Sequence, residues 1–180
     1  IRRQRQMCIR DRNDIVTLKI EDCGIDGEGI GKADGFTVFV KDAVIGDTVR
    51  AKIMKAKKNY GYGRLEEILT PSPNRVEPEC AFARQCGGCQ LQALSYEKQL
   101  EFKAGKVKGH LERIGGFTDI PMEEILGMEQ PFHYRNKAQF PVGKSKDGRI
   151  ITGFYAGRTH SIIENRDCAL GVTRNKEVLD

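Results

Sequence analysis

Hydrophobic and polar positions alternate along the first part of the chain, as they do in half-buried β-strands. The alternation is clearest at residues 48–54, where three apolar side chains share one face and two basic side chains share the other. The pattern predicts strands at 15–20, 36–40, 48–54 and 62–69. Four or five short strands in fewer than 60 residues favour a small barrel of the oligonucleotide-binding kind over a β-sandwich, and we place this barrel at residues 14–72.

A helical period replaces this alternation between Ser95 and Gly116. Apolar side chains recur at helical spacing at Tyr96, Leu100, Val107, Leu111 and Ile114. Ser95 is a suitable N-cap, and the pair of glycines that ends at Gly116 is a suitable stop. Two glycines inside the helix each lower its stability by about 1 kcal/mol relative to alanine, so we expect the helix to depend on packing against another element.

Strands return after residue 126. They are predicted at 136–142, 149–155 and 160–163, with a hairpin turn at 144–148. Residues 175–180 begin a helical pattern that has no stop, so we expect the chain to be a fragment. The chain as a whole is predicted to be mainly β with some α-helix.

Composition adds constraints but identifies no partner. The 180 residues are 39% hydrophobic and 31% charged. No stretch approaches the roughly 20 consecutive apolar residues that span a bilayer, and no secretory signal is present, so we expect a cytoplasmic protein without a membrane partner. The net charge is +5, but residues 1–12 hold five arginines against one aspartate. This basic leader, placed at 1–13, does not look native, and the net charge alone says little about partners.

A local cluster of basic and aromatic residues is more informative than the net charge. It consists of Lys55, Lys57, Lys58, Tyr60, Tyr62 and Arg64. Basic side chains that contact phosphates, next to rings that stack on bases, are what single-stranded RNA binding requires. A solvated strand pair whose aromatic rings lie half in the core explains the same pattern equally well, so both interpretations stay open.

Four of the six cysteines form a candidate metal site. Cys80, Cys86 and Cys89 lie within ten residues of one another, and Cys168 is the only cysteine downstream of them. Thiolates bind both zinc and iron–sulfur clusters. Structural zinc sites usually present two close pairs, so this arrangement of three plus one favours a cluster over zinc, and either of these over free thiols.

These residues belong to a longer pattern. Its parts are Cys80-Ala-Phe-Ala-Arg-Gln-Cys86-Gly-Gly-Cys89-Gln-Leu-Gln92, then Tyr96 and Gln99, then Phe132-His-Tyr-Arg-Asn-Lys-Ala-Gln-Phe140, then Gly153-Phe-Tyr155, and Cys168. With this pattern the chain resembles the RNA 5-methyluridine methyltransferases of bacteria, most closely the 23S ribosomal RNA (uracil-5-)-methyltransferases of the RumA type. The resemblance covers nearly the whole chain from about residue 14, and the cysteine motif with its downstream partner is specific.

The resemblance implies a domain organisation. A TRAM domain, an OB-like β-barrel that binds RNA, would occupy residues 14–72. An α+β iron–sulfur domain, truncated here, would comprise 73–92 and 126–180, and the helix region 93–125 would pack on a catalytic domain. The ligands of a [4Fe-4S] cluster would be Cys80, Cys86, Cys89 and Cys168. The Rossmann-like domain that binds S-adenosylmethionine would be absent from this chain, so we assign no catalytic residue in it and expect the fragment to be inactive alone.

The resemblance also implies a reaction and an RNA substrate. A cysteine thiolate adds to C6 of an unstacked uracil, C5 attacks the methyl group of S-adenosylmethionine, and a base removes the C5 proton. Ribosomal RNA is favoured as the partner because related transfer-RNA enzymes lack the barrel and the cluster. The expected RNA contacts are Lys55, Lys57, Lys58, Tyr60, Arg64, Arg135 and Lys137.

An alternative from a different class is a non-catalytic RNA-binding module that holds an iron–sulfur cluster or zinc. A cluster gives a brown preparation and zinc a colourless one, so the colour of the protein separates the two metals. Neither interpretation requires an obligate protein partner.

Overall fold

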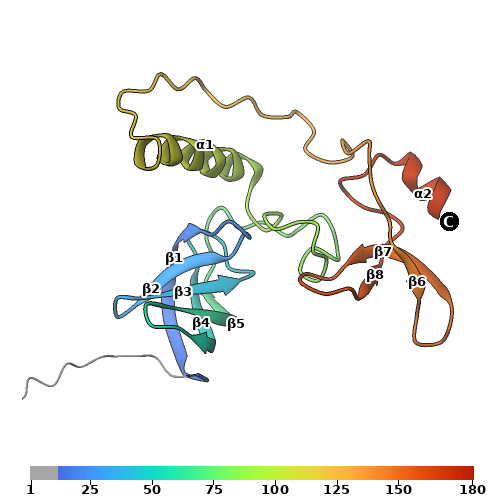
Figure 1. Cartoon of the computed structure of the whole chain (residues 1–180), viewed down its shortest axis with the longest axis horizontal. Helices are drawn as coiled ribbons and strands as arrows, with labels where there is room; N and C mark the ends of the chain where they lie inside the picture. Colours follow the sequence, from blue (N-terminus) through green and yellow to red (C-terminus); the bar gives the residue numbers. More distant parts are fainter. Residues whose placement is uncertain (1–11) are drawn as a thin grey trace, which may run out of the picture. The chain divides into compact units, whose positions relative to one another are not determined.

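The computed structural model of the chain describes residues 12–180 (Figure 1). The chain forms two compact units, which meet in the sequence between Val76 and Glu77. Apart from its last two residues, the predicted basic leader at 1–13 lies outside the described residues. None of the described helices is long and apolar enough to cross a membrane.

The first unit is a closed barrel of five strands. These are β1 (Ile15–Cys23), β2 (Gly29–Ala33), β3 (Phe36–Lys41), β4 (Thr48–Ala56) and β5 (Tyr60–Thr70). They pair in the order β1-β2-β3-β5-β4, and β4 returns to β1 to close the barrel. The pairing of β3 with β5 is parallel, and the other pairings in the barrel are antiparallel. The barrel predicted from the alternation is confirmed.

Inward-facing side chains fill the barrel with a hydrophobic core. Its buried members are Val16, Leu18, Ile20, Ala33, Phe36, Val38, Val40, Ala43, Val49, Ala51 and Ile53. Most of them occupy every second position of a strand, because successive side chains of a strand point to opposite faces. Full burial of a Val, Leu, Ile or Phe side chain contributes roughly 1.5–3 kcal/mol, so the barrel has a strong driving force of its own.

Glycine on β5 allows this strand to lie close to the core. A Cβ atom on Gly63 would lie 3.1 Å from Cγ1 of Val38 and 3.2 Å from Cβ of Ala51, closer than most real contacts of this kind. A larger residue at this inward position would require Val38 and Ala51 to shift by a few tenths of an ångström. Because side chains alternate along the strand, Tyr60 and Tyr62 point outward.

A buried ion pair holds the chain on the barrel beyond its last strand. The Asp47 carboxylate is fully buried and accepts backbone N–H bonds from Val44 (2.8 Å) and Ser72 (2.9 Å). Arg75 forms the ion pair, with 2.6 Å between Nη2 and Oδ2 of Asp47. Burial raises the pKa of Asp47, but the bonds from Arg75, Ser72 and Val44 together outweigh burial and lower it. This Asp47–Arg75 clamp extends the first unit past the boundary predicted at residue 72.

The second unit combines a small sheet with two helices. Its elements are α1 (Tyr96–Arg113), β6 (Val142–Lys144), β7 (Ile150–Tyr155), β8 (Ile162–Glu164) and α2 (Arg174–Leu179). The three strands form an antiparallel sheet in the order β6-β7-β8. Among residues 77–180 only Leu94 and Ile151 are buried hydrophobic side chains. Strands and helices are mixed as predicted, but this unit has almost no hydrophobic core.

Helix α1 begins and ends close to the predicted residues. Ser95 is its N-cap, and its Oγ accepts the backbone N–H of Lys98 at 3.4 Å. The helix ends at Arg113, and Gly116 follows with a φ of +70°, which glycine adopts without strain. The capping residues in the sequence therefore determine both ends of the helix.

The apolar stripe of α1 is covered only near its N-terminus. There the Tyr96 hydroxyl accepts the backbone N–H of Met128 at 2.8 Å, so the chain that follows the helix returns to it. Farther along, Val107 is 52% exposed and Ile114 is 80% exposed. The helix was expected to depend on packing, and in the C-terminal half of its stripe Val107 and Ile114 remain mostly exposed while Leu111 is half-buried.

The segment before β6 differs from the prediction. The alternation predicts a strand at 136–142, but β6 begins only at Val142. Arg135 instead bonds its backbone to a distant loop: its N–H donates to the Leu170 carbonyl at 2.8 Å, and its carbonyl accepts from Val172 at 3.2 Å. Pro141 has no N–H to donate to a ladder. The last predicted strand, at 160–163, is likewise shorter and later, at β8.

Candidate functional site

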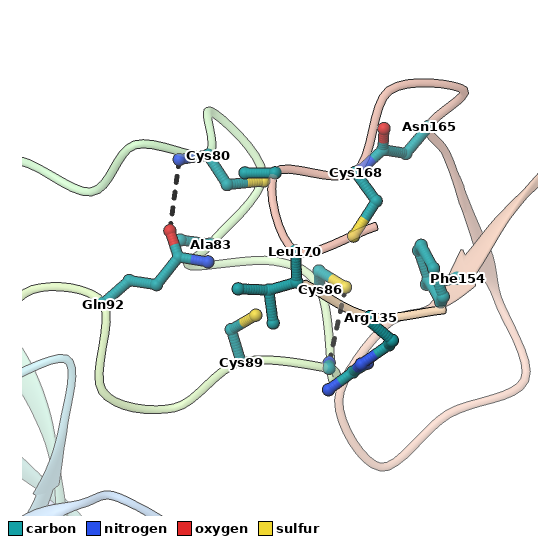
Figure 2. A pocket seen from close by; sticks show the side chains of 12 residues that line it. Cys80, Ala83, Cys86, Cys89, Gln92, Arg135, Phe154, Asn165, Cys168 and Leu170 are labelled. Atoms are coloured by element: carbon teal, nitrogen blue, oxygen red, sulfur yellow. Dashed lines mark hydrogen bonds between the residues drawn. The ribbon is translucent and has the colours of Figure 1, made fainter. Parts of the chain in front are cut away.

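The four cysteines selected by their spacing line one pocket of the second unit (Figure 2). Cys80, Cys86 and Cys89 come from the loop before α1, and Cys168 comes from the loop after β8. Other residues that line the pocket include Ala83, Gln92, Arg135, Phe154, Asn165 and Leu170. The structure thus brings together groups that lie about half the chain apart in the sequence.

Backbone hydrogen bonds hold the first cysteine loop against the end of β7. Gly87 donates its N–H to the Tyr155 carbonyl at 2.9 Å. A Cβ atom at Gly87 would lie 3.1 Å from this carbonyl and 3.2 Å from Cα of Gly157, so only glycine fits without displacement of the backbone. The next N–H, from Gly88, donates to Sγ of Cys86 at 3.4 Å. The Gly-Gly pair therefore allows both the close approach and the bond to sulfur.

The second cysteine segment is a turn stabilised by its own backbone. The N–H of Gly171 donates to the Cys168 carbonyl at 2.8 Å, and the buried Asn165 accepts the N–H of Asp167 at 2.9 Å. The N–H of His133 donates to the Ala169 carbonyl at 2.9 Å. Segments around residues 80–92, 133–135 and 165–171 consequently meet at the pocket.

The pocket disfavours free thiolates. Burial raises the pKa values of both Cys86 and Cys89, and the neighbouring cysteines of the set raise them further. The Gly88 N–H and Arg135 oppose this at Cys86, and the Gln92 amide opposes it at Cys89. A metal that binds here must therefore displace thiol protons.

The donors are suited to a soft metal, but they are not arranged around a single ion. No group of three or more His, Cys, Asp or Glu side chains within residues 12–180 is placed to hold one metal ion. One buried amide nitrogen at the pocket has the Cys89 sulfur as its potential partner: Nε2 of Gln92 makes no hydrogen bond to the protonated thiol but favours the Cys89 thiolate, while Oε1 accepts the Cys80 N–H at 3.1 Å. The pocket thus offers four thiols and at least one spare N–H donor.

The predicted RNA contacts of the barrel lie on one hairpin. Lys55 is on β4, Tyr60 and Arg64 are on β5, and Lys57 and Lys58 are in the turn between these strands, where all five are exposed. The Arg64 guanidinium forms an ion pair with Glu66 at 2.7 Å. The lysines are therefore better placed for phosphate than Arg64, whose charge is already paired.

The two predicted contacts in the second unit differ from each other. The Arg135 side chain lines the cysteine pocket, whereas Lys137 is exposed. Arg135 therefore belongs to the environment of the cysteines, and Lys137 is free to meet a phosphate.

The sequence interpretation included Tyr62 in the basic and aromatic cluster but missed Phe39, the third aromatic residue of this barrel face. Phe39 on β3 and Tyr62 on β5 both contact the Tyr60 ring, with centroids 5.7 Å and 5.8 Å from it. The signal for Phe39 was in the alternation: residues 36, 38 and 40 point into the core, so Phe39 points out. Tyr60 and Tyr62 lie on the outer face of the barrel, so neither ring is part of its core, and this placement is compatible with both a solvated face and an RNA-binding face.

Known proteins resemble this chain over most of its length. Residues 10–65 match the TRAM domain family. An "uncharacterized RNA methyltransferase" of Clostridium tetani is 52% identical over 157 residues, which are 87% of this chain and 34% of that protein. Another, of Halalkalibacterium halodurans, is 44% identical over 169 residues, or 94% of this chain and 37% of that protein. This chain spans about a third of the length of these relatives.

One solved structure is similar to both units. It is the crystal structure of the Pyrococcus abyssi tRNA (uracil-54, C5)-methyltransferase in complex with S-adenosyl-L-homocysteine. It is 26% identical, with a TM-score of 0.54, and the match covers 89% of this chain and 34% of that chain. The expectation that transfer-RNA enzymes lack the barrel is wrong for this neighbour, because a match of that extent includes the barrel. Architecture therefore does not distinguish ribosomal from transfer RNA.

Proposed function

We propose that this is an RNA methyltransferase-type protein with a TRAM domain, and we proceed from that premise. The chain is then the RNA-recognition part of an S-adenosylmethionine-dependent enzyme. The whole enzyme makes 5-methyluridine in 23S ribosomal RNA. The observation that carries the proposal is similarity across both units, at 52% identity to one RNA methyltransferase and with 89% of the chain matched to a uracil-C5 enzyme. That neighbour acts on transfer RNA, so transfer RNA is the competing substrate.

The role that we assign to this chain is binding, not methyl transfer. S-adenosylmethionine, when bound, supplies the methyl group. Cys23 is 4% exposed within the barrel, so it is not available to add to uracil C6. We assign the pocket cysteines to a metal centre, and we assign the nucleophile, the base and the methyl-donor site to the part of the relatives that this chain does not span.

We further propose that Cys80, Cys86, Cys89 and Cys168 hold a [4Fe-4S] cluster. Support comes from the all-thiol donor set, the spacing of three plus one, and the convergence of the four cysteines on one pocket. A four-iron core is larger than one ion, so its ligands stand farther apart. The Gly88 N–H and the unpaired Nε2 of Gln92 are available to sulfur, a feature that tunes such clusters.

Zinc is the alternative occupant, and a direct measurement separates the two. We expect anaerobically purified protein to be brown and to contain about four irons and acid-labile sulfide. A colourless protein with one zinc and no sulfide would show that the site holds zinc and not a cluster. If metal-free protein unfolds at the same temperature as the isolated holoprotein, the proposal of a metal centre is wrong.

The exposed C-terminal half of the α1 stripe is proposed to pack on the catalytic part of the enzyme. Val107 and Ile114 are more than half exposed, although apolar positions at helical spacing normally face another element. This is the role predicted for residues 93–125.

Methylation of C5 can be tested through the proton that it displaces. The complete protein that contains this chain would be incubated with S-adenosylmethionine and 23S ribosomal RNA labelled with tritium at C5 of uridine. We expect one tritium released per methyl group transferred, and no release from RNA labelled at C5 of cytidine. Methylation without tritium release would place the methyl group on another atom. Tritium release from transfer RNA alone would show that transfer RNA is the substrate. RNA binding without methylation would favour the alternative, a non-catalytic RNA-binding module.

A further inference from the structure

Three aromatic rings form a continuous cluster on the outside of the barrel. Phe39 and Tyr62 have ring centroids 5.6 Å apart at 34°, and the Tyr60 ring meets both nearly edge-on, at 79° and 83°. Phe39 and Tyr62 are register partners on the parallel strands β3 and β5, and Tyr60 lies on β5 opposite Thr37. We call these three rings the aromatic triad.

The triad does not belong to the barrel core. Its rings lie on the face opposite to the buried side chains of β3, and Gly61 and Gly63 occupy the inward positions of β5. Tyr60 is 37% exposed. Phe39 and Tyr62 are half-buried and none of the three rings belongs to the core, so the triad leaves part of its apolar area, mainly on Tyr60, in water that a partner would cover.

Positive charge surrounds the triad. In the strand register, Lys55 is the partner of Tyr62 on one side, and Lys32 is the partner of Thr37 on the other. Lys57 and Lys58 lie in the turn that leads into Tyr60. These four lysines are exposed, and none of them forms an ion pair within the described part of the chain. Aromatic faces with flanking cations are complementary to bases and phosphates.

We propose that the aromatic triad is a stacking platform for unpaired nucleobases, so that the barrel selects single-stranded RNA. This rests on the proposed function in RNA recognition and deepens it by naming the RNA form that is bound. The four lysines contact the phosphates on either side of the stacked bases. A duplex keeps its bases stacked on one another, and it offers the triad only backbone and groove edges. The aromatic rings contact the faces of the bases and not their edges, so binding tolerates changes in the RNA sequence.

The test measures binding of the whole chain to a single-stranded RNA and to a hairpin duplex of the same composition. Each RNA would carry one 2-aminopurine, whose fluorescence falls when it stacks on a ring. The variants are Tyr60→Leu and Phe39→Leu, with Tyr60→Phe as the conservative replacement. Phe117→Leu is the matched control, because Phe117 is an exposed ring, 58% accessible, in the other unit. Lys57→Ala/Lys58→Ala tests charge separately.

We expect the wild type to prefer the single strand and to quench 2-aminopurine. Tyr60→Leu and Phe39→Leu should each weaken single-strand binding at least about fivefold and reduce the quenching, with the salt dependence unchanged. Tyr60→Phe and Phe117→Leu should bind like the wild type. The double lysine variant should weaken binding to both RNAs and lower the slope of log affinity against log salt by about 0.7 per lost phosphate contact on the single strand.

Two different failures can be told apart. If the wild type binds RNA and the leucine variants bind it equally well, the platform is wrong and RNA recognition stands. If the wild type binds neither RNA, both the platform and the proposed function are overturned. Thermal unfolding of every variant identifies loss of fold, and because Tyr60 is partly exposed and outside the core, Tyr60→Leu retains the barrel.

Discussion

The barrel is the smaller of the two units, yet it holds most of the buried hydrophobic side chains. Of the fourteen buried hydrophobic side chains in the described residues, twelve lie in the barrel and two, Leu94 and Ile151, in residues 77–180. The barrel closes its sheet on itself and leaves no open edge. The second unit has three short strands and an irregular stretch of nearly thirty residues between α1 and β6.

This difference indicates what each unit requires in order to fold. Burial of apolar surface accounts for the barrel, but two buried side chains do not offset the conformational entropy of about a hundred residues. Units with too little core are usually stabilised by disulfides, metals or association with another domain. The proposed cluster and the exposed α1 stripe correspond to the last two of these, so the chain joins a self-sufficient module to a dependent one.

Removal of one cluster ligand is the strongest way to test this contrast. We expect Cys86→Ser to lose iron and to abolish the unfolding transition of the second unit, because the remaining thiols cannot close the site. The barrel transition should stay at its wild-type temperature. Calorimetry with hydrogen exchange resolved by region measures both units in one sample.

The matched control is the cysteine of the other unit. Cys23→Ala removes a buried thiol from the barrel and should lower barrel stability by about 1 kcal/mol. Iron content and the second transition should not change. If Cys86→Ser leaves the second unit with native exchange protection, the cluster does not hold that unit together.

The Asp47–Arg75 clamp provides the next largest effect, within the barrel. Asp47→Asn leaves the Arg75 guanidinium without its carboxylate partner, and loss of one member of a buried pair costs about 3 kcal/mol or more. Denaturant unfolding of the barrel measures this loss. Asp147→Asn is the control, because that carboxylate pairs with Arg149 on an exposed hairpin and should leave stability unchanged. Equal effects of the two changes would contradict a buried clamp.

The clamp also predicts how barrel stability depends on pH. The pKa of Asp47 is lower in the folded chain than its ordinary value of about 3.9 in the unfolded chain. Its contribution is therefore complete above about pH 4 and is lost as the pH falls through the folded pKa. The stability difference between wild type and Asp47→Asn should be constant at neutral pH and should shrink in acid. A difference that shrinks toward alkaline pH would contradict this sign.

The smallest expected effect concerns RNA binding by the second unit. Lys137→Ala should weaken RNA affinity only a few-fold and reduce the salt dependence by about one phosphate contact. Lys137 is exposed, so iron content should not change. Arg135→Ala gives the contrast, since the loss of a pocket-lining cation should accelerate loss of the metal. Unchanged RNA affinity in Lys137→Ala would assign all RNA binding to the barrel.

The same contrast determines what could be predicted from the sequence. The barrel strands follow from local alternation, because one face of each strand is buried. β2 was the exception: Gly29 and Gly31 occupy its inward positions, where a Cβ atom would collide with β1 and with Ala43, so the apolar alternation that marks the other strands is missing. The ends of α1 were predictable because Ser95 and Gly116 act through local backbone geometry.

The site was only partly predictable. The spacing of the cysteines identified the four that line one pocket, because side chains that would bind one metal centre must converge. Arg135 was expected as an RNA contact and Gln92 only as part of the motif, yet both line the pocket. Their positions depend on backbone bonds between distant loops, such as Arg135 to Leu170, which no local pattern encodes.

The clamp at the end of the barrel has a consequence for RNA capture. Because Arg75 is fixed, only four residues separate it from Cys80, and one of them is Pro78. A tether of that length reaches at most about 3.5 Å per residue, so under the proposed function an RNA strand bound by one unit would be presented to the other at an effective concentration of millimolar or more. Two weak RNA contacts, one in each module, would then bind with higher overall affinity than either alone. Lengthening this tether with glycine and serine would weaken RNA affinity without changing any contact residue.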